Sequence, residues 1–111
     1  MPGLEYSGVL LECNAAANID GFHVGDRVMG ITRFGGFTTK IHADTHYLKK
    51  VPHHWSLQEG AAFLAQALTA WYGLVVLGGV RKGHVALIHS AAGGTGLWAC
   101  HICRSLGVHV I

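Results

Sequence analysis

The sequence predicts a mixed fold, in which a β portion is followed by the start of an α/β unit. Short stretches with β-type alternation fill the first half of the chain, up to about Pro52. A helix-start signature and a long apolar run follow them. Near the C-terminus an apolar stretch leads through glycines into a helix-compatible run and then a second apolar stretch, which is the order of a β-α-β unit.

Four short segments of the first half are predicted to form strands. They are residues 6–11, 27–31, 37–42 and 47–51. A polar, alanine-containing loop is expected at 14–20, and Gly35-Gly36 marks the turn before the third segment.

The middle of the chain is predicted to be helical. Ser56 and Glu59 have the spacing of a capping box, in which each side chain satisfies a backbone N–H of the other residue. The apolar run that follows is expected to form one or two helical pieces as far as Leu77, and Gly78-Gly79 is expected to end it.

The apolar run at 61–77 is interpreted as a buried helix and not as a membrane span. A helix of this length would cover about 26 Å, which is the short limit for crossing a bilayer. Gln66, Thr69 and Gly73 interrupt the run, and it follows a helix cap of the kind found in globular domains.

The C-terminal part is predicted to form a strand from Val85, a helix at 97–106 that Gly107 ends, and the start of a second strand at 108–111. The turn between strand and helix has small residues, which allow the backbone to approach a phosphate at a helix start. Alone it is a weak fingerprint, because Ala91 replaces the first glycine of the G-x-G-x-x-G pattern.

Composition and charge exclude several classes of partner. The chain of 111 residues has a formal net charge of +2 without a basic stripe, so a nucleic-acid partner is not expected. The three cysteines, in a chain without a signal-like N-terminus, indicate reduced thiols and a cytoplasmic location. Nucleotide hydrolysis is disfavoured, because Gly96 is followed by Leu97 and not by a lysine.

No metal site is predicted. Cys100 and Cys103 have C-x-x-C spacing, but within a helix they are better explained as packing residues than as metal or redox ligands, since no second pair accompanies them. The histidine pairs 42/46 and 53/54 fall in strand, turn or loop segments without a suitable carboxylate between them.

Five segments occur in an order and spacing that resemble the medium-chain dehydrogenase/reductase superfamily. They are 3–9 (GLEYSGV), 25–28 (GDRV), 36–39 (GFTT), 68–71 (LTAW) and 91–96 (AAGGTG). Within it, the chain is most similar to the quinone oxidoreductase branch, including the vesicle amine transport protein 1 type, and to the enoyl reductase domains of fatty acid and polyketide synthases. The resemblance implies a GroES-like β portion at 1–52, a helical crossover at 53–83 and the start of a Rossmann domain at 84–111, incomplete at both ends.

The resemblance also implies a cofactor site for NADPH, with NADH as the alternative. At the matching positions it assigns the pyrophosphate turn to Ala92, Gly93, Gly94, Thr95 and Gly96. It places Thr69 near the nicotinamide, although a threonine in a helix can equally bond to its own preceding turn.

Two residues depart from the family pattern. Thr95 stands where a valine is usual, which should be harmless because the phosphate contact uses backbone N–H groups. Gln66 lies in a stretch that is usually less polar. The short turn from Val28 to Gly36 leaves no room for the cysteine-rich zinc lobe of the alcohol dehydrogenases, so a zinc-free member is implied.

The function implied is hydride transfer from the cofactor to a small-molecule substrate, either a quinone or an activated double bond. Catalytic residues are unknown, because the family's proposed proton donors have no matching positions here. Two alternatives stay open, namely an enoyl reductase domain of a synthase and a non-catalytic interaction module. Because the start of a β-α-β unit leaves sheet edges open, we expect the remainder of a longer chain or a homo-oligomer to cover them.

Overall fold

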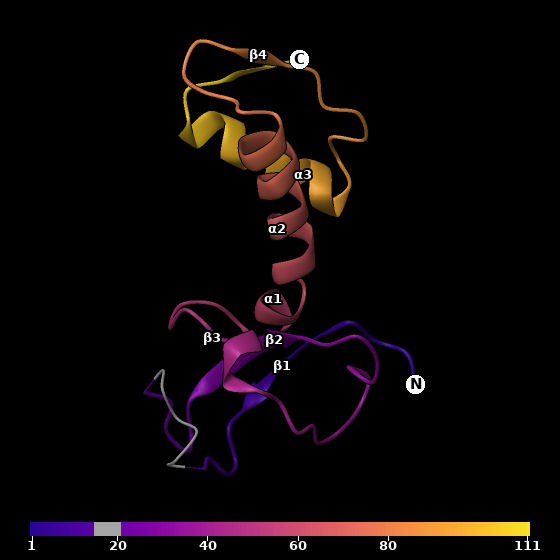
Figure 1. The fold of residues 1–111 in the computed structure, drawn as a ribbon, viewed down its shortest axis with the longest axis vertical. Helices are drawn as coiled ribbons and strands as arrows, with labels where there is room; N and C mark the ends of the chain where they lie inside the picture. The colour runs from indigo at the N-terminus through magenta and orange to yellow at the C-terminus, as the bar shows by residue number, and fades with distance from the viewer. Residues whose placement is uncertain (15–20) are drawn as a thin grey trace. The chain divides into compact units, whose positions relative to one another are not determined.

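The computed structural model describes residues 1–14 and 21–111, which form two compact units, Met1–Leu64 and Ala65–Ile111 (Figure 1). The first unit contains a small antiparallel sheet, and the second contains helices and a parallel strand pair. This bears out the mixed fold at that level, while the division at 1–52, 53–83 and 84–111 stays a prediction. The loop predicted at 14–20 lies outside the described residues, except for Asn14.

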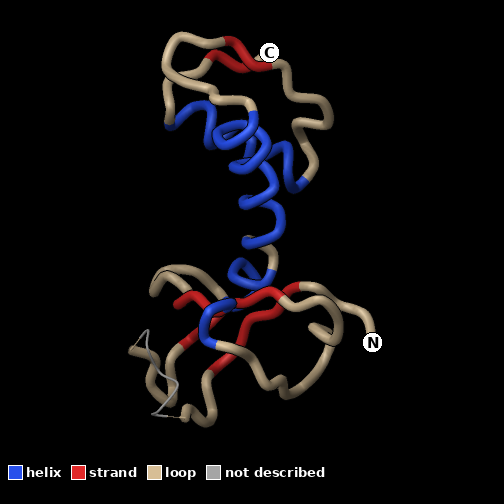
Figure 2. The backbone as a smooth tube through the Cα atoms, viewed as in Figure 1, coloured by secondary structure: helices blue, strands red, loops and turns tan. Residues whose placement is uncertain are grey.

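The sheet of the first unit contains β1 (Glu5–Val9), β2 (Arg27–Ile31) and β3 (Leu48–Lys50) in that order, all antiparallel (Figure 2). Ser7 pairs with Met29, and Met29 pairs with Lys49 on the other side. The strands predicted at 6–11, 27–31 and 47–51 are therefore confirmed, the second with its bounds unchanged.

The strand predicted at 37–42 is wrong. The backbone N–H of Phe37 donates to the carbonyl of Pro2 at 3.2 Å, but the next bonds are local ones. The N–H of Thr38 donates to the carbonyl of Gly36, and its hydroxyl donates to the carbonyl of Lys40 at 2.9 Å. The alternating pattern suits a strand, but these local bonds take the place of a ladder, so the segment is a loop.

The central strand β2 has both of its faces buried. Val28 belongs to one apolar cluster with Phe22 and Leu48. Its neighbour Met29 belongs to a second cluster with Val51 and Leu64, because successive residues of a strand point to opposite faces. The first unit therefore has two small cores, one on each side of the sheet.

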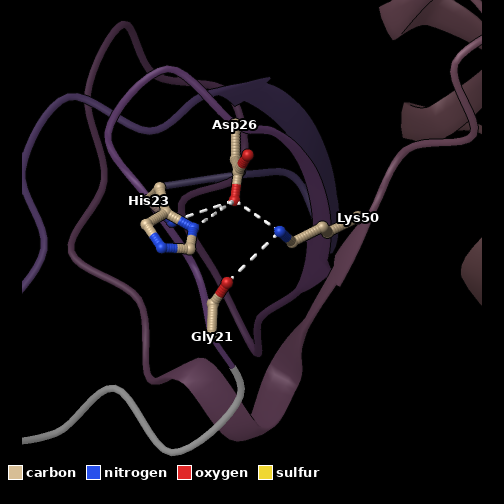
Figure 3. Close-up of polar contacts among 4 residues, drawn as sticks. All are labelled: Gly21, His23, Asp26 and Lys50. Carbon is tan, nitrogen blue, oxygen red and sulfur yellow. Dashed lines mark hydrogen bonds and ion pairs between the residues drawn. The ribbon is translucent and has the colours of Figure 1, made fainter.

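A charged cluster lies where β2 begins (Figure 3). The carboxylate of Asp26 is 2.8 Å from the ammonium of Lys50 and accepts the backbone N–H of His23 at 2.9 Å. The same ammonium donates to the carbonyl of Gly21 at 3.2 Å and lies 5.8 Å from the centre of the Phe22 ring. The hydrogen bond from Lys50, followed by that from His23, lowers the pKa of Asp26.

This cluster predicts a pH-dependent contribution of Asp26 to stability. Because its folded pKa is lowered, the contribution is present above the ordinary Asp pKa and is lost as pH falls through the folded value. The melting temperature of Asp26→Asn should lie below that of the wild type at neutral pH, and the two melting temperatures should converge in acid. The same substitution in a Lys50→Met background should have a smaller effect, and a difference that persists in strong acid would contradict this assignment.

The capping box is confirmed at α1 (Leu57–Ala61). The backbone N–H of Glu59 donates to the Ser56 hydroxyl at 3.1 Å, and the Glu59 carboxylate accepts the N–H of Ser56 at 2.6 Å. The hydroxyl of Ser7 in β1 donates to the carbonyl of Leu57, which ties the helix to the sheet.

The helical run ends where it was predicted to end. The helix α2 (Leu64–Trp71) continues into a π-helical turn, Tyr72–Leu77, in which the N–H of Gly78 bonds to the carbonyl of Gly73 at 2.9 Å. Gly79 then adopts a positive φ of 55°, which stops the run. Over residues 1–14 and 21–111, no helix has both the length and the apolar content needed to cross a bilayer.

The second unit contains the predicted strand, helix and strand. The strands β4 (Val85–Ala86) and β5 (His109–Val110) are parallel neighbours, with α3 (Gly94–Ser105) between them in sequence. Gly107 has a φ of 69° and follows the helix, as predicted. The helix begins at Gly94 and not at Leu97, so that predicted start is wrong by three residues.

Candidate functional site

The glycine turn between β4 and α3 is built from an unusual backbone conformation. Ser90 adopts a positive φ of 54°, and its carbonyl accepts the N–H of Gly93 at 2.9 Å. Gly93 is extended and caps α3 without any side-chain hydrogen bond. The carbonyl of Gly93 then accepts the N–H of Leu97 at 2.8 Å, which explains why the helix starts before Leu97.

The start of α3 presents free donors. Among residues 1–14 and 21–111, no hydrogen bond uses the backbone N–H groups of Gly94, Thr95 or Gly96. Ala92, Gly93, Gly94 and Thr95 are exposed, so a ligand can reach this end of the helix. Unused N–H groups and the positive end of the helix dipole favour an anion such as a phosphate.

Gly96 is required by a close backbone approach. A Cβ at this buried position would lie 2.8 Å from the Cα of Ala91 and 2.9 Å from the carbonyl carbon of Ser90. Both neighbours belong to the main chain of the turn, so a larger residue would have to move the turn itself. Gly96, which the sequence assigned to the cofactor site, is therefore needed for the close packing that shapes the turn.

Gly94 has a different neighbour, the side chain of Gln66 in α2. A Cβ on Gly94 would lie 2.5 Å from the Cδ and 2.8 Å from the Nε2 of that carboxamide. The half-buried Gln66 thus rests against the first turn of α3. We did not assign it to the site from the sequence, where its only signal was a polar residue inside an apolar run.

Thr69 is exposed on α2, three residues after Gln66 and therefore near the same face of that helix. The structure brings residues 92–96 together as one turn, with Gln66 against it. The role predicted for Thr69 beside the nicotinamide stays a prediction.

The two C-x-x-C thiols have different surroundings. Cys103 is fully buried and packs with Ala86 and Val108, whereas Cys100 is half-buried. Burial, with a smaller effect from Cys100, raises the pKa of the Cys103 thiol. Among the residues that the structure describes, no three His, Cys, Asp or Glu side chains form a group that could hold a metal ion.

This difference predicts selective thiol reactivity, since the thiolate is the reactive form. An alkylating reagent should modify Cys100 in the folded protein and Cys103 only after unfolding, as peptide mass analysis of both states would show. In Cys100→Ser, labelling of Cys103 should remain slow. Fast labelling of Cys103 in the folded wild type would contradict its burial.

No family model matches the chain, but individual proteins do. A probable quinone oxidoreductase of Schizosaccharomyces pombe is 36% identical over the whole chain, which spans 33% of that protein. A phenolphthiocerol synthesis polyketide synthase of Mycobacterium bovis is 38% identical over 97% of the chain, which spans 5% of that protein. The chain therefore covers at most a third of the length of these two relatives.

Solved structures of similar proteins also match nearly the whole chain, which spans about a third of each of them. A human synaptic vesicle membrane protein VAT-1 homolog-like protein superposes with a TM-score of 0.90 at 30% identity, over 99% of this chain and 35% of that one. The enoyl reductase CurK gives 0.89 at 30%, over 97% and 32%. The Escherichia coli quinone oxidoreductase complexed with NADPH gives 0.84 at 25%, over 98% and 33%.

Proposed function

We propose that the chain, which belongs to the medium-chain dehydrogenase/reductase superfamily, supplies the pyrophosphate-binding turn of an NAD(P)H-dependent oxidoreductase. The observation that carries the proposal is the turn at 92–96, which leads from β4 into α3 with three backbone N–H groups that have no partner among the described residues. These donors suit the negative charge of a dinucleotide. Further support comes from the similar Escherichia coli quinone oxidoreductase, whose structure is a complex with NADPH.

In this proposal the cofactor supplies the hydride, and the residues of the chain bind and orient it. The turn at 92–96 holds the pyrophosphate through the N–H groups of Gly94, Thr95 and Gly96, and Thr69 lies toward the nicotinamide. The hydride acceptor is a quinone or an activated carbon–carbon double bond, and NADPH is the preferred cofactor. The similarity to the Schizosaccharomyces pombe protein supports the quinone. The similarity to the enoyl reductase CurK supports the alternative, an enoyl reductase domain of a synthase.

Titration calorimetry with NADPH and with NADH tests the proposal. We expect weak, saturable binding, tighter for NADPH. Oxidation of the bound cofactor by either a quinone or an enoyl thioester, followed by absorbance, would identify the acceptor. Absence of binding of both cofactors would overturn the proposal and favour a non-catalytic module.

Two substitutions at exposed Thr95 separate ligand binding from folding. Thr95→Ala should leave the affinity unchanged, because the backbone N–H provides the contact. Thr95→Glu should weaken binding of NADPH, because its carboxylate repels a phosphate. The helix should be preserved, because a negative charge in the first turn interacts favourably with the helix dipole. Equal affinities of the two variants would argue against a phosphate at this turn.

We further propose that more polypeptide, or a second copy of the chain, covers the second unit. Large apolar side chains are exposed on and just after α2, namely Leu68, Trp71, Tyr72, Val76 and Leu77. Sedimentation of the chain should show self-association, and a stable monomer with a protected core would overturn the proposal that this surface is covered.

We also propose a cytoplasmic location of the protein, which fits its free thiols.

A further inference from the structure

We propose that Gln66 is a cofactor-positioning residue whose carboxamide donates a hydrogen bond to the pyrophosphate at the glycine turn. This inference rests on the proposed function, because it assigns a second donor element to the same site. The backbone N–H groups of α3 form one wall of the site, and the side chain of Gln66 from α2 forms another.

The carboxamide of Gln66 lies close to the start of α3. It rests against Gly94, since a Cβ there would come closest to its Oε1 and would lie 2.5 Å from its Cδ and 2.8 Å from its Nε2. Gly94 is the first residue of α3 and carries one of the unused N–H groups. The amide group therefore lies beside the first residue of α3.

The carboxamide of Gln66 also has unused hydrogen-bonding capacity. Within the described part of the chain, no hydrogen bond involves its carboxamide. The side chain is half-buried and interrupts an otherwise apolar helix, α2. Partial removal of the carboxamide from water is offset only where it gains a hydrogen-bond partner. A half-turn about χ3 exchanges the places of its oxygen and its NH₂, so that the NH₂ can donate to an oxygen of a bound diphosphate.

Gly94 is then needed for a reason other than backbone conformation. Any side chain at this position would push the Gln66 carboxamide away from the start of α3. Because the obstacle is the end of a flexible side chain, Gly94→Ala should leave the fold intact and displace only the amide. This substitution therefore tests the contact without altering Gln66.

The experiment is calorimetric titration of the protein with NADPH, with melting temperature as the measure of folding. We expect Gln66→Ala to lower the affinity about tenfold, the usual effect of losing a hydrogen bond to a charged group. Gln66→Glu should lower it further, because a carboxylate repels the diphosphate. The matched control is Gln58→Ala, at an exposed helical glutamine of the other unit, and it should change nothing.

A double-mutant cycle provides the second readout. Gly94→Ala should weaken binding in the wild-type background and have no added effect when combined with Gln66→Ala. ADP-ribose, which keeps the diphosphate but lacks the nicotinamide, should lose affinity by the same factor as NADPH. Unchanged affinity of Gln66→Ala, or additive losses in the cycle, would overturn the role of Gln66 while leaving the cofactor site. Failure of the wild type to bind any nicotinamide cofactor would overturn the proposed function itself.

Discussion

Gly96→Ala is expected to destabilise the second unit by about 2–3 kcal/mol and to abolish binding at the glycine turn. The new Cβ would meet the carbonyl oxygen of Ser90 and would lie 2.8 Å from the Cα of Ala91. These are main-chain atoms of a turn in which Ser90 already has a positive φ, so the clash can be relieved only by moving the turn. Hydrogen exchange should show faster exchange in α3, β4 and β5.

Gly94→Ala is the matched control for this prediction. Its Cβ meets the end of the Gln66 side chain, which can rotate away, and alanine favours a helix over glycine by about 1 kcal/mol. Its stability should therefore equal or exceed that of the wild type. If both alanine variants melted alike, the close approach at Gly96 would not be what shapes the turn.

Local sequence signals predicted the elements that depend on local chemistry. The capping box at Ser56 is present as two reciprocal hydrogen bonds. Gly107 ends α3 with a positive φ, and the N–H of Val108 bonds to the carbonyl of Cys103 at 2.9 Å, as expected of such an end. Both signals act over four or five residues, so no knowledge of the rest of the fold was needed.

The errors arose where the outcome depends on distant backbone. The segment at 37–42 has strand-like alternation, but a strand also needs a neighbour, and after Phe37 its bonds turn local. The start of α3 was placed too late because residues 94–96 are two glycines and a threonine, which have low helix propensity. The hydrogen bond from the N–H of Leu97 to the carbonyl of Gly93 shows that residues 94–96 already form the first turn of the helix.

The candidate site was predictable in part. The turn at 92–96 follows from its glycines and from the order of the family segments, and the structure places it at the start of α3. The approach of Gln66 to Gly94 joins residues 28 positions apart and depends on how α2 packs near α3. In the sequence, Gln66 was visible only as a polar residue inside an apolar run, with no indication of what it touches.

Leu64→Ala is expected to destabilise the first unit by about 3 kcal/mol. Leu64 is 7% exposed and packs with Met29 and Val51 on one face of the sheet. Truncation would leave a cavity in a small core, because the surrounding backbone of β2 is held on both sides by β1 and β3. Chemical denaturation should measure the loss, and hydrogen exchange should locate it in the three strands.

The comparison with Leu68→Ala decides whether this effect comes from burial. Leu68 lies one helical turn further along α2 and is 50% exposed, so at a protein concentration too low for self-association its truncation should change stability by less than about 0.5 kcal/mol. The amides of α3 should keep their protection in Leu64→Ala, since the core of α3 contains Ala86, Cys103 and Val108 and none of the residues packed with Leu64. Equal costs for the two leucines would contradict the placement of Leu64 in the core of the first unit.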